Sequence, residues 1–267
     1  MREVIFSLLT LGLIGLFFSI LLAFLSKKFS VKENEVFQKI LDILPGINCG
    51  ACGFSSCRAF AESVIKQNNT FSGCIPGGSS VNNKIKSILG ISLSTKDKKV
   101  AICHCAAEEG EKKISSEYYG PLTCKAADVI ESFLDCIYGC LGFGDCQDVC
   151  PVGAITINKR KVFININLCI GCGKCIEACP RGLFELVSLK ELPLYYVACN
   201  NKDKGVEVRK VCSKGCIGCK ICSSIENSPF IVKDNLSYID RNKKAPLGVL
   251  EEASNKCPTR CILKNNA

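Results

Sequence analysis

The sequence has few of the residues that most redox and hydrolytic sites require. It contains one histidine, His104, one methionine, Met1, and no tryptophan. A Rieske centre needs two histidines and most haem sites need histidine or methionine ligands, so these sites are excluded. A Ser-His-Asp hydrolase would have only His104, which stands between two cysteines. Disorder is excluded as well, because 48% of the residues are hydrophobic.

What the sequence has in excess is cysteine, with 22 among 267 residues, together with a formal net charge of +9. Three roles for these cysteines compete: disulfides, zinc sites and iron–sulfur clusters. Disulfide-dense proteins are small and secreted, and they are made with a cleaved signal peptide. The amino-terminal segment therefore bears directly on the choice.

An uncharged segment runs from Val4 to Leu25 and, at about 1.5 Å per residue, is long enough to cross a bilayer. No small-x-small cleavage site closes it, so an uncleaved anchor is favoured over a signal peptide. Lys27, Lys28 and Lys32 follow the segment, and the positive-inside rule places the rest of the chain in the cytoplasm. We expect a single-pass cell-membrane protein on the cytoplasmic side, where metal ligation is the default role of cysteine.

Hydrophobic periodicity divides the remaining chain into short elements. Apolar residues at helical spacing predict helices at 33–44, 55–67, 81–89 and 123–133. Alternating residues predict a strand at 100–103 and a hairpin of strands 154–158 and 161–166, turned at Lys159-Arg160. A polar, lysine-rich link is expected at 94–99.

From Cys136 onward the cysteines form repeated runs. The first reads Cys136-x3-Cys140-x5-Cys146-x3-Cys150-Pro151 and the second Cys169-x2-Cys172-x2-Cys175-x3-Cys179-Pro180. Triplets closed by Cys-Pro are typical of bacterial two-cluster ferredoxins, in which the fourth cysteine ligates the other cluster. Zinc sites use C-x2-C pairs instead, so iron–sulfur clusters are favoured. The exchange predicts two ligand sets: Cys136, Cys140, Cys146 and Cys179; and Cys150, Cys169, Cys172 and Cys175.

A third run, Cys216-x2-Cys219-x2-Cys222, is followed by a distant Cys257-Pro258 pair. The ligands of a second cluster are missing together, since neither Glu226-Asn227 nor residues 241–248 contain cysteine. We expect a degenerate ferredoxin domain that keeps one cluster. Its predicted ligands are Cys216, Cys219, Cys222 and Cys257, with Cys212 and Cys261 as nearby competitors.

The amino-terminal cysteines have a different spacing, Cys49-x2-Cys52-x4-Cys57-x16-Cys74. They provide four thiolates from two short loops that flank a predicted helix. On spacing alone, zinc competes with an iron–sulfur cluster for this set.

At these motifs the chain resembles the RnfB subunits of Rnf electron-transport complexes. The resemblance is carried by LPGINCGACGFSSCRAFA at 44–61, CIPGG at 74–78, YGCLGFGDC followed by a Cys-Pro pair at 138–151, and the amino-terminal anchor. It covers nearly the whole chain. It implies a [4Fe–4S] cluster on Cys49, Cys52, Cys57 and Cys74, and with the other sets a total of four [4Fe–4S] clusters.

The resemblance also implies a partner set and a role. Such complexes move electrons between reduced ferredoxin and NAD, coupled to Na⁺ or H⁺ translocation. Expected partners are the other membrane subunits, flavin-bearing ones included, and soluble ferredoxin. Residues 199–261 resemble the extra ferredoxin domain of longer members, but they lack the ligands of its second cluster, which leaves the electron route through this domain open.

The residues themselves indicate no catalytic constellation. Gly142-Phe-Gly144 lies inside a cysteine loop rather than after a strand, so it is not a dinucleotide-binding turn. We expect an electron-transfer subunit of a translocase with no substrate-converting site of its own. Two other interpretations stay open: a polyferredoxin of another membrane reductase or hydrogenase, and a zinc-stabilised membrane adaptor. No nucleic-acid partner is expected, because clusters of about −2 each offset most of the basic charge.

The predicted fold class is α+β, with an N-terminal transmembrane helix, a small helical 4Fe-4S domain and two ferredoxin-like modules. The expected parts are an anchor (1–28), the 4Fe-4S domain (33–92), a linking region (93–135), a two-cluster ferredoxin domain (136–190) and the degenerate domain (191–267). Six cysteines have no assigned role and are either buried apolar residues or an additional or alternative ligand set: Cys103, Cys105, Cys124, Cys199, Cys212 and Cys261.

Overall fold

The computed structural model describes residues 2–28, 35–66, 73–90, 98–130, 133–189 and 193–265. The helices are α1 (Arg2–Lys28), α2 (Glu35–Ile43), α3 (Cys57–Lys66), α4 (Gly78–Leu89), α5 (Cys124–Val129), α6 (Asp145–Asp148), α7 (Lys174–Ala178), α8 (Gly205–Val211), α9 (Leu247–Lys256) and the 3-10 helix η2 (Ile221–Ser223). The strands are β1 (Lys99–Cys103), β2 (Ile155–Asn158), β3 (Lys161–Ile164), β4 (Phe184–Ser188), β5 (Leu194–Val197), β6 (Phe230–Lys233), β7 (Leu236–Ile239) and β8 (Ile262–Asn265). The predicted α+β class is confirmed.

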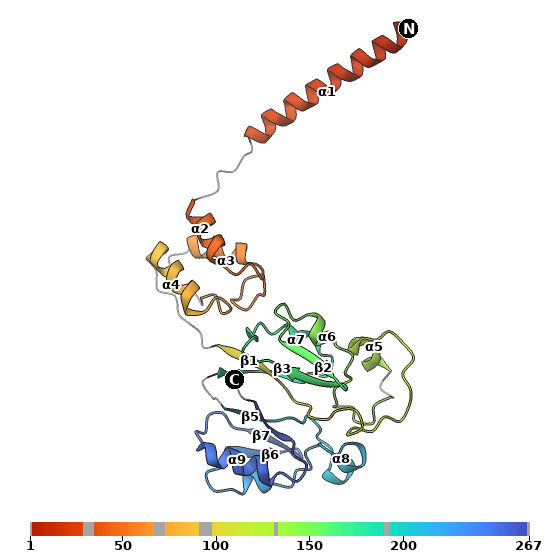
Figure 1. Cartoon of the computed structure of the whole chain (residues 1–267), viewed down its shortest axis with the longest axis vertical. Helices are drawn as coiled ribbons and strands as arrows, with labels where there is room; N and C mark the ends of the chain where they lie inside the picture. Colours follow the sequence, from red (N-terminus) through yellow and green to blue (C-terminus); the bar gives the residue numbers. More distant parts are fainter. Residues whose placement is uncertain are drawn as a thin grey trace.

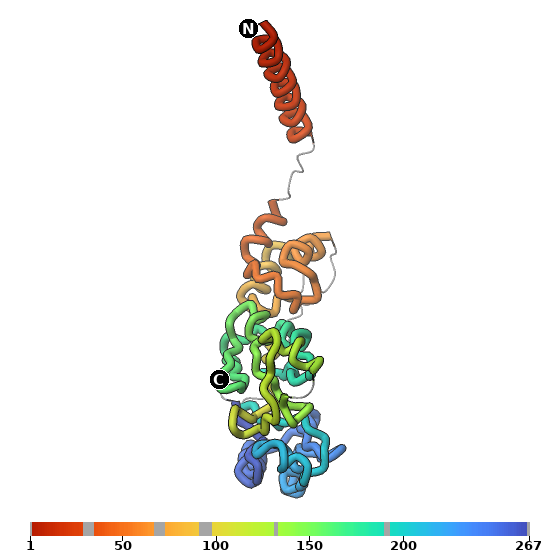
Figure 2. Tube along the Cα trace, turned by 90° about the vertical axis from the view of Figure 1, so that its right-hand side faces the viewer, coloured from red at the N-terminus to blue at the C-terminus, as the bar shows by residue number. Residues whose placement is uncertain are grey.

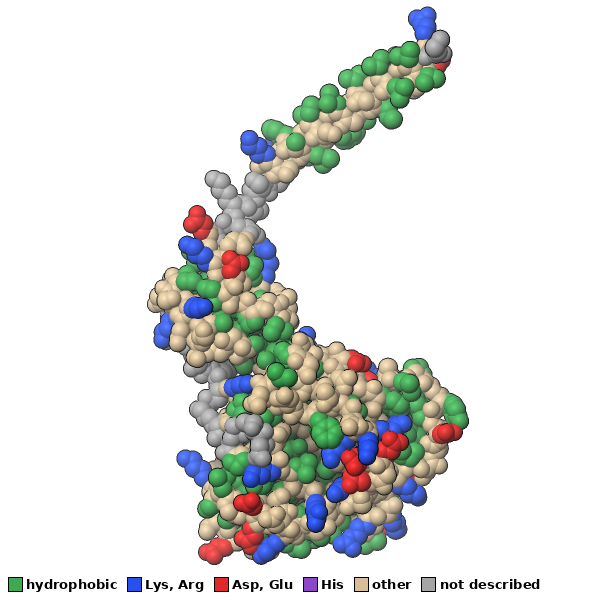
Figure 3. Space-filling model, viewed as in Figure 1, with side chains coloured by type: hydrophobic (Ala, Val, Ile, Leu, Met, Phe, Trp, Pro, Cys, Tyr) green, Lys and Arg blue, Asp and Glu red, His purple; other side chains and the backbone are tan. Residues whose placement is uncertain are grey.

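Helix α1 stands apart from the rest of the protein (Figure 1). Its apolar side chains are exposed along its length and basic residues stand at its two ends (Figure 3). The helix is long and apolar enough to span a membrane, as predicted. Lys27 and Lys28 lie in its last turn, whereas Lys32 and residues 94–97 of the predicted polar link lie outside the described residues.

A small helical domain follows, formed by α2, α3 and α4. Its core is built on Ile40, Phe60 and Ile85, each from a different helix and each almost fully buried. The amphipathic periodicity that predicted the three helices therefore reflects one shared apolar core. Gly90 ends α4 in the left-handed conformation, where a glycine is least strained.

The first ferredoxin-like module combines an antiparallel strand pair with an inner hairpin. Strand β1 pairs with β4, with Lys99 opposite Ser188, and β2 pairs with β3. The predicted hairpin and its turn are confirmed. Lys159 and Arg160 both have positive φ angles, of 46° and 56°, as a two-residue hairpin turn requires. Strand β1 comes from the stretch predicted to be a linking region, so that stretch contributes directly to this module.

The second module repeats this plan. Strand β5 pairs with β8, and β6 and β7 form the inner hairpin. Its turn residues, Asp234 and Asn235, also have positive φ angles, of 49° and 59°. The helical domain and the two modules follow one another along the long axis of the molecule (Figure 2). This arrangement places the cysteine-rich loops in a row.

Candidate metal centres

The cysteines line several cavities and do not converge on the position of a single metal ion. Within the described residues, no group of three or more His, Cys, Asp or Glu side chains converges closely enough to hold a single metal ion. Zinc would need its thiolates about 2.3 Å from one centre. A cubane presents irons at separate corners, so its ligands are spread more widely.

The amino-terminal cavity has a volume of about 330 Å³, counting the space open to solvent, and is lined by Cys49, Cys52, Cys57 and Cys74. Two asparagines fix the loops that carry these ligands. The amide of Cys57 donates to Asn48 Oδ1 at 2.8 Å, and the amide of Cys74 donates to Asn82 Oδ1 at 2.7 Å. Burial and, to a smaller extent, the neighbouring thiolates raise the pKa of Cys74 to about 11. The predicted set is therefore brought together.

The second predicted set of the first module also converges. Burial raises the pKa of Cys175 to about 12, and the nearby Cys169, Cys172 and Cys150 act in the same direction. Two backbone amides donate to these sulfurs: Ala101 to Cys169 Sγ at 3.4 Å and Ala154 to Cys150 Sγ at 3.3 Å. Hydrogen bonds of this kind stabilise a thiolate ligand.

The dicluster cavity, of about 340 Å³, lies beside this set in the first module. It is lined by Cys140, Cys146 and Cys179, as predicted, but the fourth cysteine on its wall is Cys124 rather than Cys136. Burial raises the pKa of Cys124, and hydrogen bonds from the backbone amides of residues 143–145 act in the opposite direction.

Local capping explains why Cys124 reaches the dicluster cavity. Cys124 is the first residue of α5, and Thr123 caps the helix by accepting a hydrogen bond from the amide of Ala126. The carboxylate of Asp145 accepts from the amides of Cys124 at 2.7 Å and Lys125 at 3.1 Å. Because Asp145 precedes Cys146, this contact joins the start of α5 to the ligand loop.

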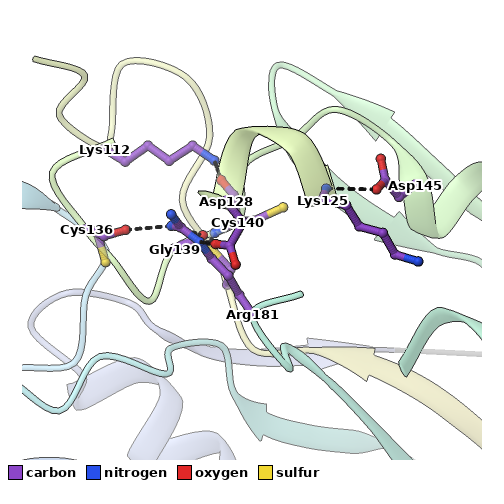
Figure 4. A network of polar contacts seen from close by, with 9 residues as sticks. Lys112, Lys125, Asp128, Cys136, Gly139, Cys140, Asp145 and Arg181 are labelled. Atoms are coloured by element: carbon purple, nitrogen blue, oxygen red, sulfur yellow. Dashed lines mark hydrogen bonds and ion pairs between the residues drawn. The ribbon is translucent and has the colours of Figure 1, made fainter. Parts of the chain in front are cut away.

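Arg181 completes the frame of the dicluster cavity (Figure 4). Its side chain is only 6% exposed and its Nε lies 2.7 Å from Asp128 Oδ1 on α5. Its Nη1 donates to the carbonyl oxygens of Cys136 at 3.0 Å and Gly139 at 2.8 Å. The guanidinium group therefore connects α5 to the loop between Cys136 and Cys140. Arg181 itself directly follows the Cys179-Pro180 pair in the sequence.

A separate cavity, which we call the bridging cavity, lies between the two modules. It has a volume of about 360 Å³ and includes Cys105, Cys136, Cys199 and Cys212 in its wall. Cys136 was predicted to belong with Cys140, and the structure places it here instead. The other three cysteines had no predicted role, because no short spacing motif connects them.

The carboxy-terminal cavity, of about 350 Å³, is lined by the four predicted ligands, Cys216, Cys219, Cys222 and Cys257, together with Cys261. The Cys261 sulfur lies 3.7 Å from that of Cys257. Hydrogen bonding to Cys261 lowers the pKa of Cys257 to about 5 and that of Cys216 to about 6. Cys261 therefore lies on the wall of this cavity beside two of its predicted ligands.

Comparisons with known proteins identify iron–sulfur domains in two of these regions. A family model of an Fe-S cluster domain matches residues 44–76, and a model of a 4Fe-4S dicluster domain matches residues 135–183. The chain is 36% identical to the B subunit of the proton-translocating ferredoxin:NAD(+) oxidoreductase complex of Clostridium ljungdahlii, over 98% of this chain and 93% of the relative.

Two further relatives have similar names. The B subunit of the ion-translocating oxidoreductase complex of Methanosarcina acetivorans is 33% identical over 96% of each chain. The B subunit of the Na(+)-translocating ferredoxin:NAD(+) oxidoreductase complex of Acetobacterium woodii is 35% identical over 94% of this chain and 75% of the relative.

Proposed function

Because the chain belongs to the RnfB family, the B subunits of ion-translocating ferredoxin:NAD(+) oxidoreductase complexes, we propose that it passes electrons from reduced ferredoxin into such a complex. The observation that carries the proposal is the row of cysteine-lined cavities through the helical domain and both modules. The chain acts as an electron-transfer subunit of an oxidoreductase, and partner subunits convert the nicotinamide substrate.

The donor chemistry of the cavities fits [4Fe–4S] clusters. Each cavity offers thiol ligands, and in the set that contains Cys150 and Cys169 backbone amides donate to these two sulfurs in the way that stabilises thiolates. A [4Fe–4S] cluster supplies a one-electron carrier. The proposed ligand sets are Cys49, Cys52, Cys57 and Cys74; Cys150, Cys169, Cys172 and Cys175; Cys140, Cys146 and Cys179 with a fourth cysteine; and Cys216, Cys219, Cys222 and Cys257.

The protein surrounds these thiols with apolar side chains. Val100, Ile102 and Leu183 are almost fully buried in the core that contains Cys140, Cys146, Cys169 and Cys175. A dry environment of this kind limits reorganisation around a charge that changes by one electron. No proton donor or acceptor is required for that transfer, which agrees with the lack of a catalytic constellation in the sequence.

Helix α1 would anchor the protein, with the cluster-bearing domains on the cytoplasmic side, where soluble ferredoxin is available. Flavin-bearing membrane subunits are the proposed acceptors. The basic turn of the first hairpin, Lys159-Arg160, is partly engaged within the molecule. Arg160 packs over Phe143 at 5.1 Å and donates to the carbonyl of Leu141 at 3.1 Å.

The direct test mixes the full-length, cluster-loaded chain in detergent with a chemically reduced plant-type [2Fe–2S] ferredoxin under anaerobic conditions. The EPR spectrum of the reduced [2Fe–2S] ferredoxin is distinct from that of [4Fe–4S] clusters. Rapid freezing should show the ferredoxin signal decaying while [4Fe–4S] signals of the chain appear. A chain that stays oxidised beside reduced ferredoxin would contradict the proposal. A zinc-bound chain without sulfide would instead support the adaptor interpretation.

A further inference from the structure

The bridging cavity has the features of the predicted cluster sites, although no motif assigns it. We propose that Cys105, Cys136, Cys199 and Cys212 hold a fifth [4Fe–4S] cluster, and that Cys124 replaces Cys136 as the fourth ligand of the dicluster cavity. The inference rests on the proposed function. Its first support is the lining: four cysteines from segments far apart in the sequence lie on the wall of this one cavity, as the cysteines do in the dicluster cavity and the carboxy-terminal cavity.

Hydrogen-bond donors face the sulfurs of the bridging cavity. The amide of Cys140 donates to Cys105 Sγ at 3.4 Å, and the side-chain Nδ2 of Asn201 donates to Cys136 Sγ at 3.5 Å. Cys199 Sγ accepts from the amide of Asn201 at 3.5 Å and from the amide of Cys216 at 3.2 Å. Such N–H groups are what a thiolate ligand of a cluster requires, and buried neutral thiols have no comparable need for them.

The fourth sulfur, that of Cys212, has the same kind of environment. Cys212 is partly buried, and the backbone amides of Lys214 and Gly215 donate hydrogen bonds to its sulfur. The carboxamide of Asn201 is almost fully buried, at 2% exposure, so its donation to Cys136 is specific rather than incidental.

A buried cation lies on the same wall. Lys112 is only 4% exposed, and its Nζ donates to the carbonyl oxygens of Cys140 at 2.6 Å and Arg160 at 2.9 Å. Burying an ammonium group is costly unless negative charge is near. A cluster with four thiolates carries about −2 when oxidised, and it would provide that compensating charge.

The position of the bridging cavity gives the proposed cluster a role. The amide of Cys140, a ligand of the dicluster site, donates to Cys105, and the amide of Cys216, a ligand of the carboxy-terminal site, donates to Cys199. The fifth cluster would therefore join these two sites. One electron enters it from one neighbour and one electron leaves to the other, with no bond or proton change.

Five sets of four account for all of the 22 cysteines except Cys103 and Cys261. The count is tested by measuring iron and acid-labile sulfide in the full-length chain, purified anaerobically in detergent and reconstituted with iron and sulfide. The unmodified chain should contain about 20 iron and about 20 acid-labile sulfide.

Pairs of substitutions separate the two ligand assignments. Cys105→Ala combined with Cys136→Ala should remove about four iron atoms, because both residues serve one cluster. Cys124→Ala combined with Cys136→Ala should remove about eight iron atoms, because these residues serve two clusters. The matched control is Cys103→Ala, a buried cysteine beside the same sites, which should leave iron unchanged.

Two results would overturn the inference: about 16 iron atoms in the unmodified chain, or full iron in the Cys199→Ala and Cys212→Ala variants. In each variant, EPR signals of the remaining clusters report whether the fold persists. A chain with about 16 iron atoms would leave the proposed function standing. A chain without iron and sulfide would overturn the proposed function itself.

Discussion

At the scale of single residues, the fourth ligand of the dicluster cavity illustrates what spacing can and cannot predict. Cys136 lies closer in sequence to Cys140 than Cys124 does, so motif spacing favours it. In the structure, Thr123 and Asp145 hold the start of α5 against the ligand loop, and Cys124 reaches the cavity. A cap made by a distant side chain leaves no spacing pattern. The unassigned cysteines were the only hint in the sequence.

Arg181 is the side chain on which this local frame depends most. Arg181→Ala removes the cation beside Asp128 and a donor to the carbonyl groups of Cys136 and Gly139, and should lower the free energy of unfolding of the loaded chain by about 3 kcal/mol. Thermal unfolding followed by circular dichroism measures this. Lys210→Ala removes an exposed pair with Glu207 and serves as the control, with little expected change. Equal midpoints for the two variants would contradict the role of Arg181.

Glu185 makes stability depend on pH. The hydrogen bond to His104 lowers the pKa of Glu185 below its ordinary value of about 4.5, and Arg241 acts in the same direction. A depressed carboxylate pKa stabilises the fold above the unfolded value, and this contribution is lost as the pH falls through the folded value. Glu185→Gln should therefore flatten the fall of the unfolding midpoint below about pH 4.5.

The control for Glu185→Gln is Glu177→Gln, which changes an exposed carboxyl group on α7. Its unfolding midpoint should follow that of the unmodified chain at each pH. If Glu185→Gln follows the unmodified chain as well, the contacts of Glu185 with His104 and Arg241 contribute nothing to the pH dependence.

At the scale of elements, the hairpins and amphipathic helices were predictable because each depends on local pattern. The turn at Lys159-Arg160 and the helices α2, α3 and α4 lie where the sequence predicts them. The pairing of β1 with β4 was not predictable. The sequence predicts a strand at 100–103, but its partner β4 follows the second cysteine run, more than 80 residues further on, and no local pattern joins the two.

The close approach of β1 to a ligand loop leads to an element-scale prediction. Gly171 and Gly173 share one loop and both have positive φ angles, of 65° and 81°. A Cβ at Gly171 would collide with the backbone carbonyl of Lys99 in β1, whereas the nearest atom to a Cβ at Gly173 is Leu186 Cδ1 at 3.9 Å. The two positions therefore have similar backbone conformations but differ in the room available for a Cβ atom.

Gly173→Ala should cost about 1 kcal/mol, from the positive φ alone. Gly171→Ala should cost at least about 3 kcal/mol and release iron from the set containing Cys172, because the strand and the loop must separate. Unfolding by guanidinium and iron analysis measure both effects. Similar costs for the two variants would show that the contact with β1 is not tight.

At the scale of the whole molecule, the cysteine sets form a connected row. Burial raises the pKa of Cys172, and the nearby Cys49 of the helical domain raises it as well. Burial likewise raises the pKa of Cys146, and Cys175 of the neighbouring set adds to this effect. The bridging cavity continues the row into the second module. The sequence predicted the domains at either end of this row, but the cavity between modules depends on how they pack, which no single motif encodes.

The charge of the molecule is consistent with this account. A formal charge of +9 is largely offset when several clusters of about −2 are bound. Lys112 and Arg181, both buried beside cysteine sets, place part of that positive charge where the clusters would lie. Part of the excess of basic over acidic side chains therefore lies in the interior of the protein, and the rest lies on its surface.

The central claim is that this chain is a membrane-anchored carrier of electrons through [4Fe–4S] clusters. Anaerobic quantification of iron, acid-labile sulfide and zinc in the full-length chain tests it most directly. The account predicts iron and sulfide in equal amounts, about 20 of each per chain, with only traces of zinc. Stoichiometric zinc without sulfide would contradict it.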